Sequence, residues 1–225
     1  MRSKTKQIVA LTAGVVFAVV AVALTTAGLI PHALGSAGAA LFGVVPLLVG
    51  FERGADEKKI VLLAVLISVA VVGRWAFAFL PNFTLSTGFV ILAGVLLGAR
   101  SGFAAGAVTV LVSNVLLGQG LWTPWQMMAT GLIGIGAAAL SRFDTPALTV
   151  YAVFAGFMYG VVLDVFSMFA MFDKPSVSAF LTVWGASFFF DLAHAVSSAL
   201  TVIAFHRFLK KRIGRVLRQS PQSDV

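Results

Sequence analysis

The chain has 225 residues, of which 60% are hydrophobic and 11% are charged. This composition is typical of a membrane protein with several spans, because a bilayer core of roughly 30 Å requires about 20 apolar residues per helix. The net charge of +8 does not indicate a nucleic-acid partner here, since basic residues in such a protein set its topology and contact membrane lipids. The sequence contains no cysteine, which excludes disulfides and thiolate chemistry within it.

Eight apolar stretches follow one another along the chain. In lipid every backbone polar group must be satisfied within the protein, and the stretches are too long for barrel strands, so we expect an all-α fold. The predicted spans are Ile8–Ile30, Ala37–Phe51, Ile60–Leu80, Leu85–Leu97, Gly102–Leu117, Trp125–Leu140, Leu148–Met171 and Ala179–Phe208.

The breaks between the spans suggest how the chain is organised. Thr123-Pro124 and Thr145-Pro146 each predict a helix that starts with a capping threonine before a first-turn proline. A charged linker from Glu52 to Lys59 separates the first two spans from the other six. We therefore expect an accessory two-helix segment over residues 1–56, a six-helix membrane core over residues 57–212 and a basic, polar cytoplasmic tail over residues 213–225.

Two neighbouring spans, Leu85–Leu97 and Gly102–Leu117, are short. Short, glycine-interrupted membrane segments mark substrate cavities in transporters. The alternative is a pair of short helices in a locally thinned bilayer.

The basic residues predict the orientation of the spans. If the eight spans alternate, all of the 16 basic residues except Arg74 and Lys174 fall on one side of the membrane. By the positive-inside rule this side is cytoplasmic, so both termini are expected in the cytoplasm. One span more or fewer would scatter the basic residues over both faces, which favours the even number.

Four ionisable residues lie within predicted spans, where charged groups are costly and are candidates for function by default. They are Arg74, Asp164, Asp191 and His194. Arg74 and Asp164 fall in the outer half of the bilayer. Asp191 and His194 lie near the midplane of the bilayer, on one face of the last predicted span. Two interpretations stay open: the residues line a pocket open to the outer face, or they neutralise one another as a structural ion pair.

Amide and aromatic side chains gather at the same outer level. They are Asn82, Asn114, Gln119, Trp122, Trp125 and Gln126. Flat aromatic walls with amides and a few charges suit a vitamin-sized ligand, whereas tryptophans at this level also act as interfacial anchors.

Small residues recur at fourfold spacing in two places, Ala10/Gly14/Ala18 and Ala64/Ser68. Such stripes allow close helix contacts, either within the chain or with a partner helix. No phosphate-binding glycine loop, zinc-protease motif or serine nucleophile elbow occurs, so we predict no ATPase activity, catalytic residue, metal site or cofactor.

Several motifs resemble the substrate-binding S components of energy-coupling factor (ECF) transporters, in particular a branch with two extra N-terminal helices. The most specific is Ser113–Met127, which contains Gly-Gln-Gly-Leu-Trp-Thr-Pro-Trp-Gln. Weaker matches are Gly73-Arg74, Leu80–Phe83, Val90–Gly94, Phe157–Gly160 and Phe190–Ala195, so that the resemblance covers roughly residues 57 to 212.

The resemblance implies a multi-pass protein of the bacterial cytoplasmic membrane that binds a vitamin near the outer face and is not an enzyme. It implies as partners a transmembrane scaffold subunit and two cytoplasmic ATPases, and a toppling motion that releases the cargo. Cobalamin is our first choice of ligand. Riboflavin, folate, pantothenate, thiamine and queuosine precursors are the alternatives.

The motifs, together with the polar residues above, define the expected substrate site. It consists of Arg74, Asn82, Phe83, Asn114, Gln119, Trp122, Trp125, Gln126, Tyr159, Asp164, Asp191 and His194. The family's scaffold-facing Ala-x-x-x-Ala motif corresponds to Ala64 and Ser68, with serine in place of the second alanine. A second departure is Ser197-Ser198, where Gly-Asn is expected in this branch.

Two other classes of protein fit the same residues. One is a membrane enzyme that acts on a lipid or isoprenoid and uses Asp164, Asp191 and His194 for acid–base chemistry. The other is a non-catalytic assembly or regulatory membrane protein.

Overall fold

The structure is a computed structural model that describes residues 57–218 and, before them, only positions 20, 24, 29–31, 34–35 and 37–38. The predicted accessory segment over residues 1–56, with its two spans, therefore lies outside the described residues apart from these positions. The Ala10/Gly14/Ala18 stripe and both termini lie outside them as well.

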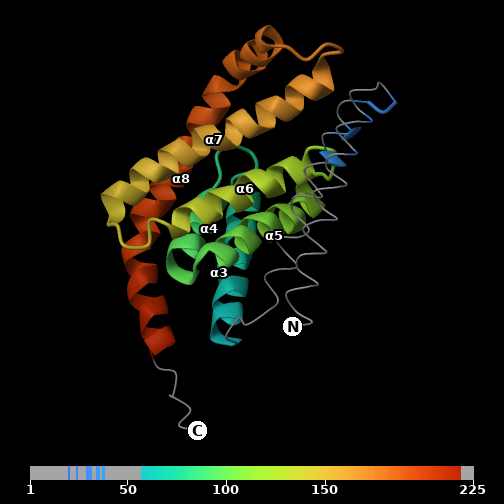
Figure 1. Cartoon of the computed structure of the whole chain (residues 1–225). Helices are drawn as coiled ribbons and strands as arrows, with labels where there is room; N and C mark the ends of the chain where they lie inside the picture. The colour runs from blue at the N-terminus through green and yellow to red at the C-terminus, as the bar shows by residue number, and fades with distance from the viewer. Residues whose placement is uncertain are drawn as a thin grey trace.

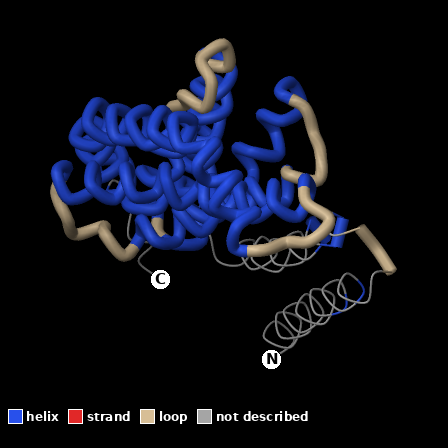
Figure 2. The backbone as a smooth tube through the Cα atoms, turned by 90° about the horizontal axis from the view of Figure 1, so that it is seen from above, coloured by secondary structure: helices blue, strands red, loops and turns tan. Residues whose placement is uncertain are grey.

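Residues 57–218 form six α-helices and contain no strand (Figures 1 and 2). They are α3 (Glu57–Ala76), α4 (Ser86–Leu97), α5 (Ala99–Leu117), α6 (Thr123–Ala138), α7 (Thr145–Met171) and α8 (Val177–Arg218). Four of them, α3, α5, α7 and α8, are long and apolar enough to span a membrane. The predicted all-α class is thus confirmed over these residues.

Two of the predicted helix boundaries differ from the structure by more than three residues. α3 ends at Ala76 instead of Leu80, because the chain then turns through a loop in which Asn82 has a left-handed φ of 57°. α8 continues beyond Phe208 to Arg218 and through the predicted boundary at residue 212. It continues because Ile213 is buried against other helices, although the surrounding residues are charged.

The helix starts also correct a detail of the capping prediction. Pro124 and Pro146 do lie in the first turns of α6 and α7, where a missing N–H is tolerated. The cap of α7, however, is Asp144, whose Oδ1 accepts a hydrogen bond from the Ala147 N–H at 3.3 Å. Thr145 Oγ1 lies 2.9 Å from Nδ1 of His206 instead.

α4 lies at the centre of the bundle. It has 12 residues, and all of them except Leu96 are buried. α4 contacts all five other described helices, which is expected of a helix that is apolar on every face.

Glycines bring α4, α5 and α6 into close contact. A side chain on Gly94 would collide with the backbone of Gly134, and one on Gly134 would collide with the backbone of Gly102. Gly94 and Gly102, which lie in the two short predicted spans, therefore allow close packing of these helices against α6. α5 is also longer than the predicted span, since it starts at Ala99.

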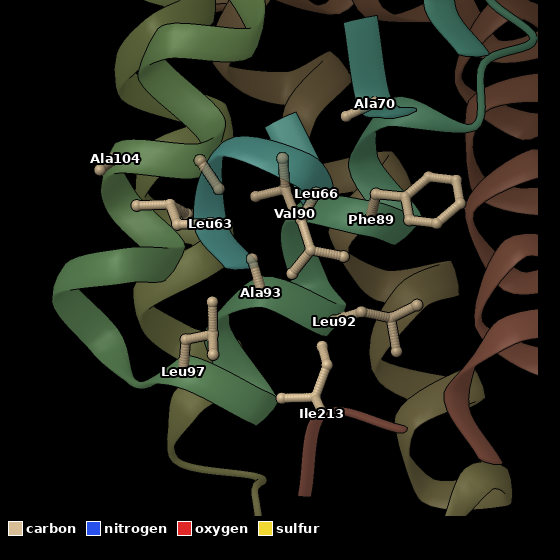
Figure 3. Close-up of a cluster of buried hydrophobic side chains, with 11 residues drawn as sticks. Leu63, Leu66, Ala70, Phe89, Val90, Leu92, Ala93, Leu97, Ala104 and Ile213 are labelled. Carbon is tan, nitrogen blue, oxygen red and sulfur yellow. The ribbon is translucent and has the colours of Figure 1, made fainter. Parts of the chain in front are cut away.

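A hydrophobic cluster joins α3, α4, the first half of α5 and the end of α8 (Figure 3). It includes Leu63, Leu66, Phe89, Leu97 and Ile213. In Figure 1 the start of α3 and the end of α8 accordingly point to the same side of the molecule.

This side carries most of the basic residues of the described chain. Lys59 lies in the first turn of α3, Arg100 in the first turn of α5 and Arg142 in the α6–α7 turn. Arg207 is the first of six exposed basic residues near the end of α8. We call this side the basic end. Its cytoplasmic location stays a prediction.

Candidate functional site

The opposite end of the bundle contains two adjoining cavities beneath the loop that joins α3 to α4. One has a volume of about 170 Å³, and its lining includes Arg74, Thr84 and His194. We call it the arginine chamber. The other, the aspartate chamber, has a volume of about 370 Å³, and its lining includes Asp164 and Asp191. The two chambers share Pro81, Asn82, Gln126 and Tyr159, so we treat them as one site.

In the arginine chamber, Arg74 is held by neutral groups. Its Nη1 donates hydrogen bonds to Ser113 Oγ at 2.5 Å and to Asn114 Oδ1 at 2.7 Å. The Asn114 amide in turn donates to Gln126 Oε1 at 2.9 Å and to Thr123 Oγ1 at 3.0 Å. The polar network thus links α3, α5 and α6 and fixes the position of the guanidinium.

His194 contributes an aromatic and a polar surface to the same chamber. Its ring stacks on Tyr159 with a centroid distance of 4.4 Å and an interplanar angle of 16°. Nε2 lies 2.7 Å from the Thr87 hydroxyl. Nδ1, the other ring nitrogen of His194, is buried without a hydrogen-bond partner among the described residues.

The aspartate chamber contains two buried carboxylates. Asp164 is 4% exposed and Asp191 is 2% exposed. The hydroxyl of Ser187 lies 2.8 Å from Oδ2 of Asp164 and 3.1 Å from Oδ2 of Asp191. Gly160 provides the space for the Asp191 carboxylate, because a side chain at this position would collide with it.

The loop above the chambers is attached to α8 by a serine. The backbone N–H of Thr84 donates a hydrogen bond to Ser197 Oγ at 3.1 Å, and both residues are buried. Thr84 Oγ1 also accepts from the Ser86 N–H at 3.1 Å. Ser197, which departs from the pattern of the resembled branch, therefore positions this loop.

Eight of the twelve predicted substrate-site residues line one or both chambers. They are Arg74, Asn82, Phe83, Gln126, Tyr159, Asp164, Asp191 and His194. Asn114 lies behind them, between Arg74 and Gln126.

The other three predicted residues do not line the chambers. Gln119 is exposed and donates a hydrogen bond to the Leu111 carbonyl at 2.8 Å. Trp122 is 42% exposed. Trp125 packs against Phe166 on α7, with a centroid distance of 6.4 Å.

Sequence reasoning missed some residues that line the chambers. Thr84, Leu117, Ser187 and Phe190 are among them. Ser187 has one signal in the sequence, since it precedes Asp191 by one helical turn and so shares its face.

The interpretation of Arg74 as the ion-pair partner of Asp164 is not supported. Arg74 uses Ser113 and Asn114 as partners, and Asp164 accepts from Ser187. Within the described residues, neither Asp164 nor Asp191 has a hydrogen bond or ion pair with Arg74. The positive and negative charges therefore occupy different chambers of the site.

The face of α3 that carries Ala64 and Ser68 is open and apolar. Both residues are exposed, and Val61 and Val65 beside them are 62% and 54% exposed. The Ser68 hydroxyl donates to the Ala64 carbonyl at 2.9 Å. Because its polar group is satisfied within its own helix, serine leaves this face nearly as apolar as alanine would.

These observations define a helical membrane protein with a polar, partly charged cavity near one end of its bundle. Over residues 57–218, no group of three or more His, Cys, Asp and Glu side chains that could hold a metal ion occurs. The arrangement is suited to binding an organic ligand.

A family model described as the substrate-specific component of ECF transporters matches residues 58–211, from the first turn of α3 almost to the end of α8. The chain belongs to this family. It is accordingly a multi-pass membrane protein of the class that supplies the substrate-binding subunit of a transporter and associates with ECF scaffold and ATPase modules. No curated protein and no solved structure gives a match to the chain.

Proposed function

We propose that the chain captures a vitamin-type heterocycle in the two chambers and hands it to an ECF importer for ATP-driven uptake. The observation that carries this proposal is the convergence of buried polar groups from α7 and α8 on one cavity. Polar and ionised groups buried in a membrane protein are costly, and they persist where they serve a ligand or one another.

The volumes of the chambers favour a small ligand. Organic ligands of ordinary size occupy sites of roughly 300–1,000 Å³. With volumes of about 170 and 370 Å³, the two chambers together lie within the lower part of this range and suit a compound with one or two rings, such as thiamine or a queuosine precursor. Cobalamin, with its corrin macrocycle and nucleotide tail, would require a much larger opening, so we place it behind these compounds.

The lining groups suggest how a ring would be held. Tyr159 borders both chambers and presents an aromatic face, and Phe83 adds a second apolar ring. The amides of Gln126 and Asn82 can donate and accept hydrogen bonds at the edges of a heterocycle.

We place the basic end in the cytoplasm and the chambers toward the outer face of a bacterial cytoplasmic membrane. In this arrangement the ligand enters beneath the α3–α4 loop. The open face of α3 at Ala64 and Ser68 would contact the transmembrane scaffold, and the scaffold would connect the chain to the two ATPases.

The direct test is identification of the small molecules that the purified full-length protein retains. Mass spectrometry after denaturation should detect a heterocycle, and calorimetric titration with thiamine, riboflavin, pantothenate, folate, cobalamin and queuosine precursors should yield a saturable Kd for at least one. If the protein retains nothing and none of these compounds binds, the proposal is wrong.

A further inference from the structure

The two carboxylates of the aspartate chamber share a single donor. A hydroxyl has one hydrogen, so Ser187 cannot donate to Asp164 and Asp191 at the same time. Ser187 also lies 3.1 Å from the Trp184 carbonyl, which competes for that hydrogen. Both residues are nonetheless at least 96% buried. When both are ionised, at least one of them therefore lacks a donor that the described part of the protein could supply.

Buried carboxylates without donors are strongly disfavoured. No described cation offsets them, because Arg74 is bonded to Ser113 and Asn114 in the other chamber. The space beside the carboxylates is the aspartate chamber, whose remaining lining includes the apolar residues Leu163 and Phe190. A ligand that fills this chamber meets two carboxylates against a mainly apolar background.

The arginine chamber carries a positive charge, in contrast to the carboxylates of the aspartate chamber. Arg74 has neutral partners and retains its positive charge. His194 is 3% exposed, lines this chamber, and has no partner for Nδ1. The part of the His194 ring that lines the chamber adds a neutral aromatic surface beside the guanidinium. A hydrogen-bond acceptor on the ligand would suit Arg74.

We infer that the ligand is a flat heterocycle that carries a cationic nitrogen group, which Asp164 and Asp191 bind, and a hydrogen-bond acceptor that faces Arg74. This inference rests on the proposed function and specifies the class of its substrate. Ammonium and amidinium groups supply several N–H donors at once, and charge-assisted hydrogen bonds to carboxylates are the stronger kind. Tyr159, which borders both chambers, would lie along the ring between the two ends.

The test compares two probes that differ in charge and have the same bicyclic core. One is 7-aminomethyl-7-deazaguanine, which carries an ammonium group, and the other is 7-cyano-7-deazaguanine, which carries a neutral nitrile. Thiamine serves as a second cationic probe, and riboflavin and pantothenate serve as a neutral and an anionic probe. Each is titrated calorimetrically into the full-length protein in detergent micelles.

We expect a cationic probe to bind at least about tenfold more tightly than the neutral and anionic probes. Asp164→Asn and Asp191→Asn should each remove most of this preference. Asp173→Asn is the matched control, because this exposed residue lies in the turn between α7 and α8 and does not line the chambers. It should change the Kd less than about twofold.

Two further measurements test the inference of a cationic ligand if an Asn variant is poorly folded. Ser187→Ala keeps both carboxylates and should preserve the preference for the cationic probe. The preference of the unmodified protein for a cationic over a neutral or anionic probe also tests the inference, and measuring it requires no variant. Tighter binding of a neutral or anionic probe, with no change in folded Asn variants, would overturn the inference and leave the proposed function intact. Absence of binding by every probe, with no retained small molecule, would overturn both.

Discussion

Gly160 on α7 and Asp191 on α8 lie directly against each other, and the space that a side chain at position 160 would occupy is filled by the Asp191 carboxylate. The pair belongs to the α7–α8 contact, one of the most extensive in the bundle. A glycine on one helix thus allows a buried carboxylate on the other to reach the aspartate chamber.

This relationship predicts the effect of Gly160→Ala. The added methyl group must displace the carboxylate, so we expect ligand affinity to fall at least about tenfold, as for loss of a buried charged contact. Gly185→Ala is the control, because a side chain there meets only open space on α8. It should leave the Kd unchanged and stabilise the helix by up to about 1 kcal/mol. Equal affinities of the two variants would contradict the assigned role of Gly160.

The neighbouring serines Ser197 and Ser198 offer a second matched comparison. Ser197→Ala leaves the buried Thr84 N–H without an acceptor, which should cost about 1–3 kcal/mol of stability and accelerate ligand release from beneath the loop. Ser198 is equally buried, but its hydroxyl has no partner among the described residues. Ser198→Ala should therefore be neutral or stabilising. Thermal melting and stopped-flow dissociation would distinguish them, and a larger loss for Ser198→Ala would contradict this account.

The sequence predicted helices more reliably than their ends. The predicted span Leu148–Met171 and α7 end at the same residue, because the apolar run stops there. α8 continues past Phe208, because hydropathy records charged neighbours but not the burial of Ile213 against α3 and α4. Propensity and hydropathy are local quantities, and this extension depends on a tertiary contact.

The positions of residues along their predicted helices placed many of the residues that line the chambers at one level. These positions could not predict which residues contact one another. The choice between Asp164 and Asn114 as the neighbour of Arg74 depends on how α3 is rotated against α5. A single sequence does not specify how α3 is rotated against α5. Ser187 was missed for a related reason: its spacing from Asp191 is visible in the sequence, but its contact with Asp164 depends on how α7 packs against α8.

The predicted orientation can be tested independently of any ligand. Reporter fusions at Arg100 and Arg142 should be cytoplasmic, and a fusion at Lys174 should be external, because the first two belong to the basic end. An external reporter at Arg142 would contradict the eight-span topology.

The open face of α3 predicts a defect in assembly that is separate from ligand binding. Ser68→Trp should block close approach of a scaffold helix and abolish copurification of the scaffold, while the isolated protein keeps its ligand affinity. Val150→Trp is the control, since Val150 is 72% exposed on α7, away from this face. If Ser68→Trp copurifies the scaffold as well as the unmodified protein does, the interface lies elsewhere on the protein.

A double-mutant cycle on Arg74 tests the hydrogen-bond network of the arginine chamber. Because Arg74 Nη1 bonds to Asn114, the effects of Arg74→Ala and Asn114→Ala on ligand affinity should be strongly non-additive, with a coupling of about 1–3 kcal/mol. The effects of Arg74→Ala and Asp164→Asn should be additive within about 0.5 kcal/mol, since these residues share no hydrogen-bond partner within the protein and would contact opposite ends of the ligand. Calorimetry on the single and double variants yields both couplings. A structural Arg74–Asp164 ion pair would produce the reverse, with the double variant recovering the stability that Arg74→Ala loses.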